Sequence, residues 1–330
     1  MKKILTQLFE YQKLSFSEAR QVLFDIAAGQ YNHAQISAFL SAYMMRPITV
    51  AELQGFRAAL LELCRPVDLS DFETIDLCGT GGDGKNTFNV STLTAFVLAG
   101  AGYKVAKHGN YGVSSVCGSS NVMEYLGYTF SNKQDRLYQQ LDKNNLTFLH
   151  APLFHPAMKA VAPVRRELGM KTFFNMLGPL VNPARPQNQL VGVFNLELAR
   201  LYKYILQEGK QAYTIVHSLD GYDEISLTSA FRSITRETDR LIEPRELGLA
   251  KLAPKDLFGG DTIEAAAQIF IQILDGKGTL AQQNVVAANA ALAMQMLDGT
   301  TLEDGVARAK ETLASGKARQ TLTQLIANSK

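Results

Sequence analysis

The 330-residue sequence has no tryptophan and only three cysteines, Cys64, Cys78 and Cys117. An odd, sparse set of cysteines without CxxC spacing argues against a disulfide framework and against a cysteine-based zinc site. The sequence also lacks an N-terminal signal segment and any apolar run long enough to cross a bilayer. Its formal net charge is only +2, without the basic excess typical of nucleic-acid or membrane-surface binding. We therefore expect a cytoplasmic protein that binds neither nucleic acid nor membrane.

The hydrophobic pattern divides the chain into two parts. Residues 1–65 favour helices only, with capping-box patterns at 15–18 and 49–52. From about residue 70, short β-branched strands alternate with helices, which predicts a mainly parallel sheet covered by helices. We expect an α/β protein with a small all-helical N-terminal domain and a larger α/β domain. The predicted boundaries are 1–65 and 70–330, with helices near 165–180 packing on the helical domain.

The predicted strands and C-terminal helices follow from the same pattern. The strands are expected at 74–78, 104–107, 146–149, 190–194 and 213–216. Apolar helical periods predict three late helices at 263–274, 282–297 and 302–315. Active sites of parallel sheets lie at the carboxyl ends of their strands. The loops after the predicted strands are therefore the places to look for chemistry.

The first of these loops is rich in glycine. A strand ending at residue 78 leads into Gly-Thr-Gly-Gly-Asp-Gly at 79–84, and Asn-Val-Ser-Thr at 89–92 then opens a helix. Glycines let backbone N–H groups turn inward, and a helix N-terminus offers unpaired donors together with the positive end of its dipole. The pattern predicts a phosphate-binding site.

Two familiar phosphate motifs nearly fit this loop. Residues 79–84 have the G-x-G-x-x-G spacing of dinucleotide sites, but the next predicted strand ends in Lys107, where an acidic residue is needed for the ribose. The P-loop motif needs Ser or Thr after Lys85, and Asn86 stands there instead. We predict a phosphate cradle of another kind. The carboxylate of Asp83 within it favours a metal–phosphate complex.

Two further loops carry polar groups. Residues 107–120 are rich in glycine and hydroxyl side chains, with Lys107 suited to a phosphate and Ser119 at a helix start. Asp223 and Glu224 are adjacent carboxylates, which repel each other unless they are solvated or bound to a cation such as Mg²⁺. An exposed acidic turn is the alternative explanation for this pair. Arg165 is able to pair with a carboxylate, although a surface arginine on an apolar helix is the commoner case.

These motifs, in their order along the chain, resemble those of the anthranilate phosphoribosyltransferase family of tryptophan biosynthesis. The resemblance covers nearly the whole chain, and the matching motifs lie at 79–84, 89–92, 107–110, 155–159, 174–183 and 223–226. It implies transfer of the phosphoribosyl group of phosphoribosyl pyrophosphate (PRPP) to the amine of anthranilate, with pyrophosphate as the second product. It also implies two Mg²⁺ ions per subunit and a homodimer formed through the helical domain.

The resemblance further implies roles for single residues in catalysis and in anthranilate binding. Asp83, Lys107 and Arg165 would act by positioning and electrostatics, with no general base assigned. Gly79, Asn110 and Arg165 would contact anthranilate.

The resemblance likewise assigns metal and PRPP ligands. Ser91, Asp223 and Glu224 would bind the magnesium ions. The residues implied for PRPP are Gly79, Gly82, Asp83, Thr87, Asn89, Val90, Ser91, Thr92, Lys107, His108, Gly109, Asn110, Tyr111, Gly112, Val113, Ser114, Ser115 and Ser119.

Two other functions of the same scaffold stay open at this point. A pyrimidine nucleoside phosphorylase would not need Asp223 and Glu224 for magnesium, so the carboxylate pair counts against it. A non-enzymatic relative that binds nucleic acid predicts a basic groove, which the net charge of +2 does not favour. One departure from the family pattern is Tyr111, at a position where the family commonly has arginine.

Overall fold

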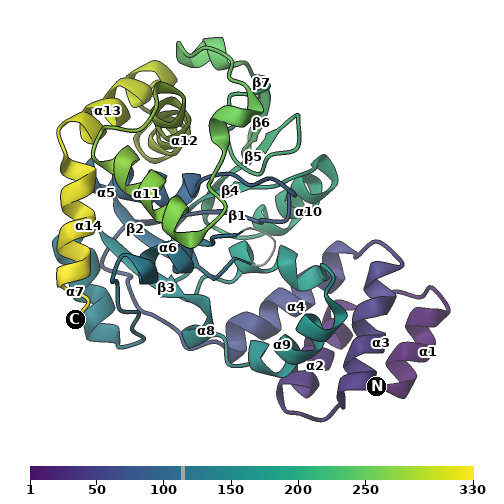
Figure 1. Cartoon of the computed structure of the whole chain (residues 1–330). Coiled ribbons are helices and arrows are strands. Elements are labelled where there is room, and N and C mark those ends of the chain that lie inside the picture. The colour runs from purple at the N-terminus through teal and green to yellow at the C-terminus, as the bar shows by residue number, and fades with distance from the viewer. Residues whose placement is uncertain (113–115) are drawn as a thin grey trace. The chain divides into compact units, whose positions relative to one another are not determined.

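The structure, a computed structural model, describes residues 1–112 and 116–330. Val113, Ser114 and Ser115, which the family resemblance assigns to PRPP, lie outside the described residues. The chain forms two compact units (Figure 1). The helical unit comprises residues 1–67 and 151–185, and the sheet unit comprises residues 68–150 and 186–330.

The helical unit contains both predicted capping boxes. The side chain of Ser15 accepts the N–H of Glu18 at the start of the second helix, and Thr49 accepts that of Glu52 at the start of the fourth. The helices of residues 1–67 are α1 (Lys2–Phe9), α2 (Phe16–Ala27), α3 (His33–Met44) and α4 (Val50–Leu63). The second stretch adds α8 (Ala151–Phe154), α9 (Met158–Leu168) and the short 3-10 helices η1 (Phe173–Met176) and η2 (Gly178–Leu180).

An aromatic core joins the two stretches of the helical unit. Phe173 stacks on Phe56 with ring centroids 4.5 Å apart, and it meets Phe39 and Tyr43 edge to face. Burying these rings together removes a large apolar area from water. Residues 151–185 therefore belong with the helical unit, and the continuous 70–330 domain expected from the sequence is interrupted by this segment.

The sheet unit is built on one seven-stranded sheet in the order β3-β2-β1-β4-β5-β6-β7. The first five strands of that order are parallel neighbours, whereas β6 and β7 form an antiparallel edge that the sequence pattern did not predict. The strands are β1 (Thr74–Gly79), β2 (Lys104–Gly109), β3 (Leu146–His150), β4 (Asn188–Gly192), β5 (Ala212–Ser218), β6 (Phe231–Ile234) and β7 (Asp239–Ile242).

Helices cover the sheet, which confirms the predicted fold class. Helix α5 packs on β1 and β2, α12 packs on β4 and β5, and α10 packs on β5. Figure 1 shows α11 to α14 gathered along one side of the sheet and α10 on the other. The helices are α5 (Val90–Gly100), α6 (Ser119–Tyr125), α7 (Gln134–Asn144), α10 (Leu196–Leu206), α11 (Ile263–Leu274), α12 (Leu280–Asp298), α13 (Leu302–Ala314) and α14 (Lys317–Ala327), with 3-10 helices η3 (Pro244–Leu247) and η4 (Pro254–Leu257).

Within residues 1–112 and 116–330, every helix falls short of the length and apolarity that a membrane span requires.

Candidate functional site

The carboxyl ends of β1, β4 and β5 meet at one edge of the sheet, because these strands are parallel neighbours in register. The glycine loop follows β1, and the loop with the two adjacent carboxylates, residues 219–230 (the acidic loop), follows β5. The backbone N–H of Gly81 donates to Oδ2 of Asp223 across 2.6 Å. Two of the loops expected from the sequence to carry chemistry are therefore in direct contact.

Two paired glycines make room for Asp223. Gly79 ends β1 and lies opposite Gly192, which ends β4. A Cβ atom added to Gly79 would overlap the carboxylate of Asp223, and one added to Gly192 would overlap its backbone carbonyl. Only glycine at both positions lets the acidic loop approach the sheet edge this closely.

Three carboxyl groups gather at this edge, and each resists ionisation. Burial raises the pKa of Asp223 well above its usual value, and the charges of Glu224 and Asp83 raise it further. Burial also raises the pKa of Asp83. Burial raises the pKa of Glu224 to about 7, although Lys107 and Ser91 act in the opposite direction. A divalent cation would relieve both the burial cost and the repulsion, so these residues fit a magnesium ion.

The carboxyl groups do not form a closed metal cage. In the part of the chain that the structure describes, no three His, Cys, Asp or Glu side chains are grouped to hold a metal ion alone. Mg²⁺ commonly keeps several waters and takes other ligands from substrate phosphates. The arrangement is therefore suited to a cation that arrives together with a phosphate compound.

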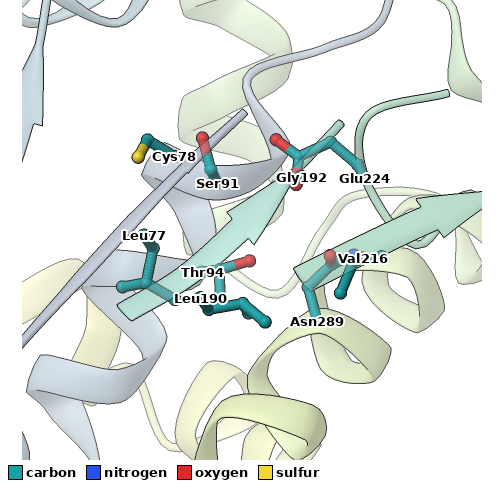
Figure 2. Close-up of a pocket in the computed structure, with 9 residues that line it drawn as sticks. All are labelled: Leu77, Cys78, Ser91, Thr94, Leu190, Gly192, Val216, Glu224 and Asn289. Atoms are coloured by element: carbon teal, nitrogen blue, oxygen red, sulfur yellow. The ribbon is translucent and has the colours of Figure 1, made fainter. Parts of the chain in front are cut away.

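The N-terminus of α5 provides the matching anion site. Ser91, in the first turn of α5, lies beside Glu224, and its backbone N–H and hydroxyl act to lower the pKa of that carboxyl group against the larger effect of burial. Asn89 precedes the helix but makes no side-chain cap; its Nδ2 donates instead to the carbonyl of Cys117 across 3.1 Å. Figure 2 shows Ser91 and Glu224 side by side at one end of a small cavity. The first turn of α5 thus lies where its helix dipole favours a negatively charged group.

Lys107 lies beneath this site. Its side chain is only 2% exposed, and Nζ donates to the carbonyl of Leu77 and lies 3.4 Å from Oγ of Ser91. A buried ammonium beside the first turn of α5 adds a fixed positive charge to the helix dipole. The ammonium of the predicted phosphate-binding Lys107 therefore lies between β1 and the first turn of α5, the two elements that the glycine loop connects.

The loop after β2 is closed by an asparagine that the sequence analysis did not assign. Oδ1 of Asn121 accepts the N–H of Gly112 at 2.9 Å and that of Gly118 at 3.0 Å. The carbonyl of Asn110 accepts the N–H of Ser120 and the hydroxyl of Ser119. These bonds hold both ends of the loop, and with it the predicted ligands Asn110, Gly112 and Ser119.

The remaining predicted PRPP residues fall into three groups. Thr87 has a buried hydroxyl with no partner among the described residues, so it is free to donate to a ligand. The side chains of Val90 and Thr92 are buried in the core, which leaves only their backbone to face a ligand. Gly82 lies in the glycine loop and Tyr111 in the loop after β2, whereas His108 and Gly109 are the last two residues of β2 itself.

Arg165 belongs to the helical unit and lies on α9. Its Nη2 donates to Oδ1 of Asn175 across 3.3 Å, and its guanidinium lies 5.6 Å from the ring centre of Phe174. Burial lowers the pKa of Arg165. Over the described ranges, Arg165 forms no ion pair with a carboxylate of the chain. A partly desolvated cation without a counter-charge fits an anionic ligand.

Besides Asn121, sequence reasoning missed two residues at the site, Gly192 and Asn289, which both line the small cavity. Gly192 carried a weak signal, a glycine inside a predicted apolar strand. Asn289 also carried one, a polar side chain within an alanine-rich apolar helix. Neither signal shows a role by itself, because Gly192 and Asn289 reach the site only through the packing of β4, β5 and α12.

Fold and site together are those of a glycosyl transferase. The helical bundle domain of the glycosyl transferase family matches residues 2–64, and the a/b domain of that family matches residues 71–319. The two matches cover most of the chain and correspond to the helical N-terminus and the sheet unit.

Comparison with known proteins identifies the family within this class of transferases. The chain is 58% identical over 325 residues to an anthranilate phosphoribosyltransferase of Flavobacterium psychrophilum, covering 98% of each chain. It superposes on the Saccharomyces cerevisiae enzyme in complex with PRPP and Mg with a TM-score of 0.91, at 27% identity, covering 98% and 96% of the two chains. For the same yeast enzyme with 4-fluoroanthranilate, the TM-score is 0.88 at 26% identity, with the same coverage. The chain belongs to the anthranilate phosphoribosyltransferase family, as its motifs predicted.

Proposed function

We propose that this chain transfers the phosphoribosyl group of PRPP to the amine of anthranilate and releases pyrophosphate, as a step of tryptophan biosynthesis. The contact between the glycine loop and the acidic loop, made by Gly81 and Asp223, carries the proposal. It places anion-binding N–H groups beside buried carboxylates that need a cation. A magnesium–pyrophosphate group supplies both partners in one ligand.

Backbone donors and one buried lysine would hold the pyrophosphate. The glycine loop and the first turn of α5 present N–H groups, and Lys107 adds a fixed positive charge. Thr87 contributes an unpaired hydroxyl. Negative charge grows on pyrophosphate as the bond to the sugar breaks, so donors fixed in place stabilise the transition state more than the ground state.

Asp223 and Glu224, with Ser91, would hold Mg²⁺. When bound, the ion supplies further stabilisation of the charge on the leaving group. A magnesium requirement is supported by the yeast relative, whose complex holds PRPP and Mg. The number of two ions per subunit stays a prediction.

Anthranilate binding is assigned to Arg165, Gly79 and Asn110. The guanidinium of Arg165 lacks a carboxylate partner among the described side chains and would pair with the carboxylate of anthranilate. No general base is assigned, because the aromatic amine is neutral at pH 7 and orientation of the two reactants lowers the barrier.

We also propose that the protein is a cytoplasmic homodimer that pairs through the helical unit. That unit exposes large apolar side chains, among them Phe9 at 61%, Tyr11 at 77% and Met45 at 82%. Large apolar side chains left exposed on this unit are available for such an interface. Sedimentation of the purified chain would test the dimer.

The decisive experiment follows the fluorescence of anthranilate in the presence of PRPP and Mg²⁺. The wild type should consume anthranilate in a Mg²⁺-dependent way, and the double variant Asp223→Asn with Glu224→Gln should lose nearly all activity. The control is Asp142→Asn with Glu197→Gln, which makes the same charge change at exposed sites and should stay active.

No turnover by folded wild-type protein would overturn the proposal. Assays of nucleoside phosphorolysis and of nucleic-acid binding would then test the two alternatives left open by the sequence.

A further inference from the structure

A buried asparagine holds the acidic loop from below. Asn289 lies on α12 and is only 2% exposed. Its Oδ1 accepts the N–H of Ile225 at 3.1 Å, and its Nδ2 donates to the carbonyl of the same residue at 3.0 Å. One side chain thus pairs with both backbone groups of the residue directly after Glu224, as a neighbouring strand would.

The position of Asn289 within its helix makes this pairing notable. Its neighbours Ala288 and Ala290 are fully buried, and Nδ2 also donates to the carbonyl of Val285 one turn earlier, across 2.8 Å. A buried amide is costly unless its hydrogen bonds are made. All three bonds of Asn289 are made, and two of them go to the acidic loop.

The side chain is also close to the residues that would bind the metal. A small cavity of about 10 Å³ lies under the loop and is lined by Ser91, Glu224 and Asn289, among others (Figure 2). In Figure 2, Asn289 points from its helix toward the strands, on the opposite side of the cavity from Ser91 and Glu224. Asn289 therefore bonds to the residue next to Glu224, and the side chains of Asn289 and Glu224 line the same cavity.

Other contacts also restrain the loop, but among the bonds found in the described residues the N–H and carbonyl of Ile225 pair with Asn289 alone. The hydroxyl of Ser218, at the end of β5, donates to the carbonyl of Glu224 across 2.7 Å. Gly192 contacts the backbone of Asp223 from the side of β4. Without Asn289, the N–H and C=O of Ile225 would be buried without these partners, and an unpaired buried backbone group drives a local shift.

We infer that Asn289 is a positioning residue of this site, which fixes the peptide after Glu224 and so aims the carboxylates of Asp223 and Glu224 at a divalent cation. The inference rests on the proposed function. Groups that orient metal ligands change metal affinity by about ten- to a hundredfold when they are removed. We expect a loss of at least about tenfold here.

The test measures binding of Mn²⁺ in the presence of inorganic pyrophosphate, by electron paramagnetic resonance, on the full-length chain. Asn289→Ala should weaken Mn²⁺ binding by about tenfold or more. Asn284→Ala is the matched control, because Asn284 is buried on the same helix and makes no bond to the acidic loop among those found in the described residues. Its Mn²⁺ affinity should equal that of the wild type.

Two further measurements separate positioning from folding. Thermal unfolding shows whether each variant is folded, and Asn289→Ser replaces the alanine variant if the latter does not fold. In the anthranilate assay, the Mg²⁺ concentration for half-maximal rate should rise about tenfold, while the KM for anthranilate stays unchanged.

Unchanged Mn²⁺ affinity in a folded Asn289 variant would overturn the inference, and so would an equal loss in Asn284→Ala. If the wild type turns over but the Asn289 variants behave like it, the inference alone fails. If the wild type neither turns over nor binds Mn²⁺ with pyrophosphate, the proposed function fails and the inference fails with it.

Discussion

A Cβ atom built on Gly192 would overlap the backbone carbonyl oxygen of Asp223. The two residues come from different strands, since Gly192 ends β4 and Asp223 follows β5. Because Gly192 has no side chain, the backbone of Asp223 can lie against β4, and this fixes where the carboxylate of Asp223 is placed. This contact also makes Gly192 the most direct place to disturb the site without removing any functional group.

Gly192→Ala should displace the acidic loop and reduce kcat/KM by about a hundredfold, because small misplacements of reacting groups have effects of that size. Steady-state anthranilate consumption measures the effect. Gly209→Ala is the control: its added Cβ would meet nothing closer than 3.5 Å, so its rate should be that of the wild type. An equally active Gly192→Ala protein would show that the loop tolerates displacement.

Lys107→Met keeps most of the length of the side chain and removes its charge. We expect kcat/KM for PRPP to fall by about a hundredfold or more, which corresponds to roughly 3 kcal/mol of transition-state stabilisation. The comparison variant is Lys104→Met, on the same strand, whose Nζ donates to the carbonyls of Leu141 and Asp142 away from the site. Similar losses in both variants would mean that the effect comes from strand stability and not from charge at the site.

Arg165→Lys should raise the KM for anthranilate by about tenfold and leave the KM for PRPP unchanged, because lysine cannot pair with a carboxylate through two parallel hydrogen bonds. Initial rates with each substrate varied in turn separate the two constants. Arg166→Ala, at the exposed neighbouring position, should change neither. A rise in the KM for PRPP alone would move Arg165 out of the anthranilate site.

Buried His150 should make the stability of the protein fall at acid pH. Its ring stacks on Phe130 with centroids 4.3 Å apart, and its Nδ1 lies 2.8 Å from Oγ of Ser120. Burial lowers the pKa of His150 to about 4, whereas an unfolded histidine titrates near about 6.5. Between these values only the unfolded chain binds the proton. The free energy of unfolding should therefore fall, by up to about 1.4 kcal/mol per pH unit, as the pH drops from 6.5 to 4.

Urea unfolding at pH 7.5 and pH 5.0 measures this loss. His150→Gln should lose less stability between the two pH values than the wild type does, whereas His33→Gln, at an exposed position, should lose as much. The loss will not vanish in His150→Gln, because burial also lowers the pKa of His155, in the helical unit, to about 4. Equal losses in wild type and His150→Gln would contradict the prediction.

Features encoded over a few neighbouring residues could be predicted from the sequence. The capping box at Ser15 and Glu18 forms as expected, because both partners lie within one helical turn. The glycine loop and the acidic loop come together as expected, because parallel strands bring their carboxyl ends to one edge.

Features set by distant pairing could not be predicted. The antiparallel strands β6 and β7 depend on pairing with β5, and the charged, exposed residues of β7 give no alternating apolar pattern. The close approach of Gly192 to Asp223 needs β4 and β5 to be neighbours in the sheet, which brings together two residues 31 positions apart in the sequence. The roles of the single site residues stay predictions until the variants above are measured.

The position of Phe173 in the aromatic core affects how the helical unit folds while the chain is being synthesised. The helical unit needs residues 151–185 as well as residues 1–67, and a ribosome synthesises the chain from its N-terminus. While the first three strands are being synthesised, Phe39, Tyr43 and Phe56 have no Phe173 to cover them. A nascent chain that stops before residue 173 should therefore expose an apolar surface that chaperones bind, and that surface should close soon after Phe173 leaves the exit tunnel.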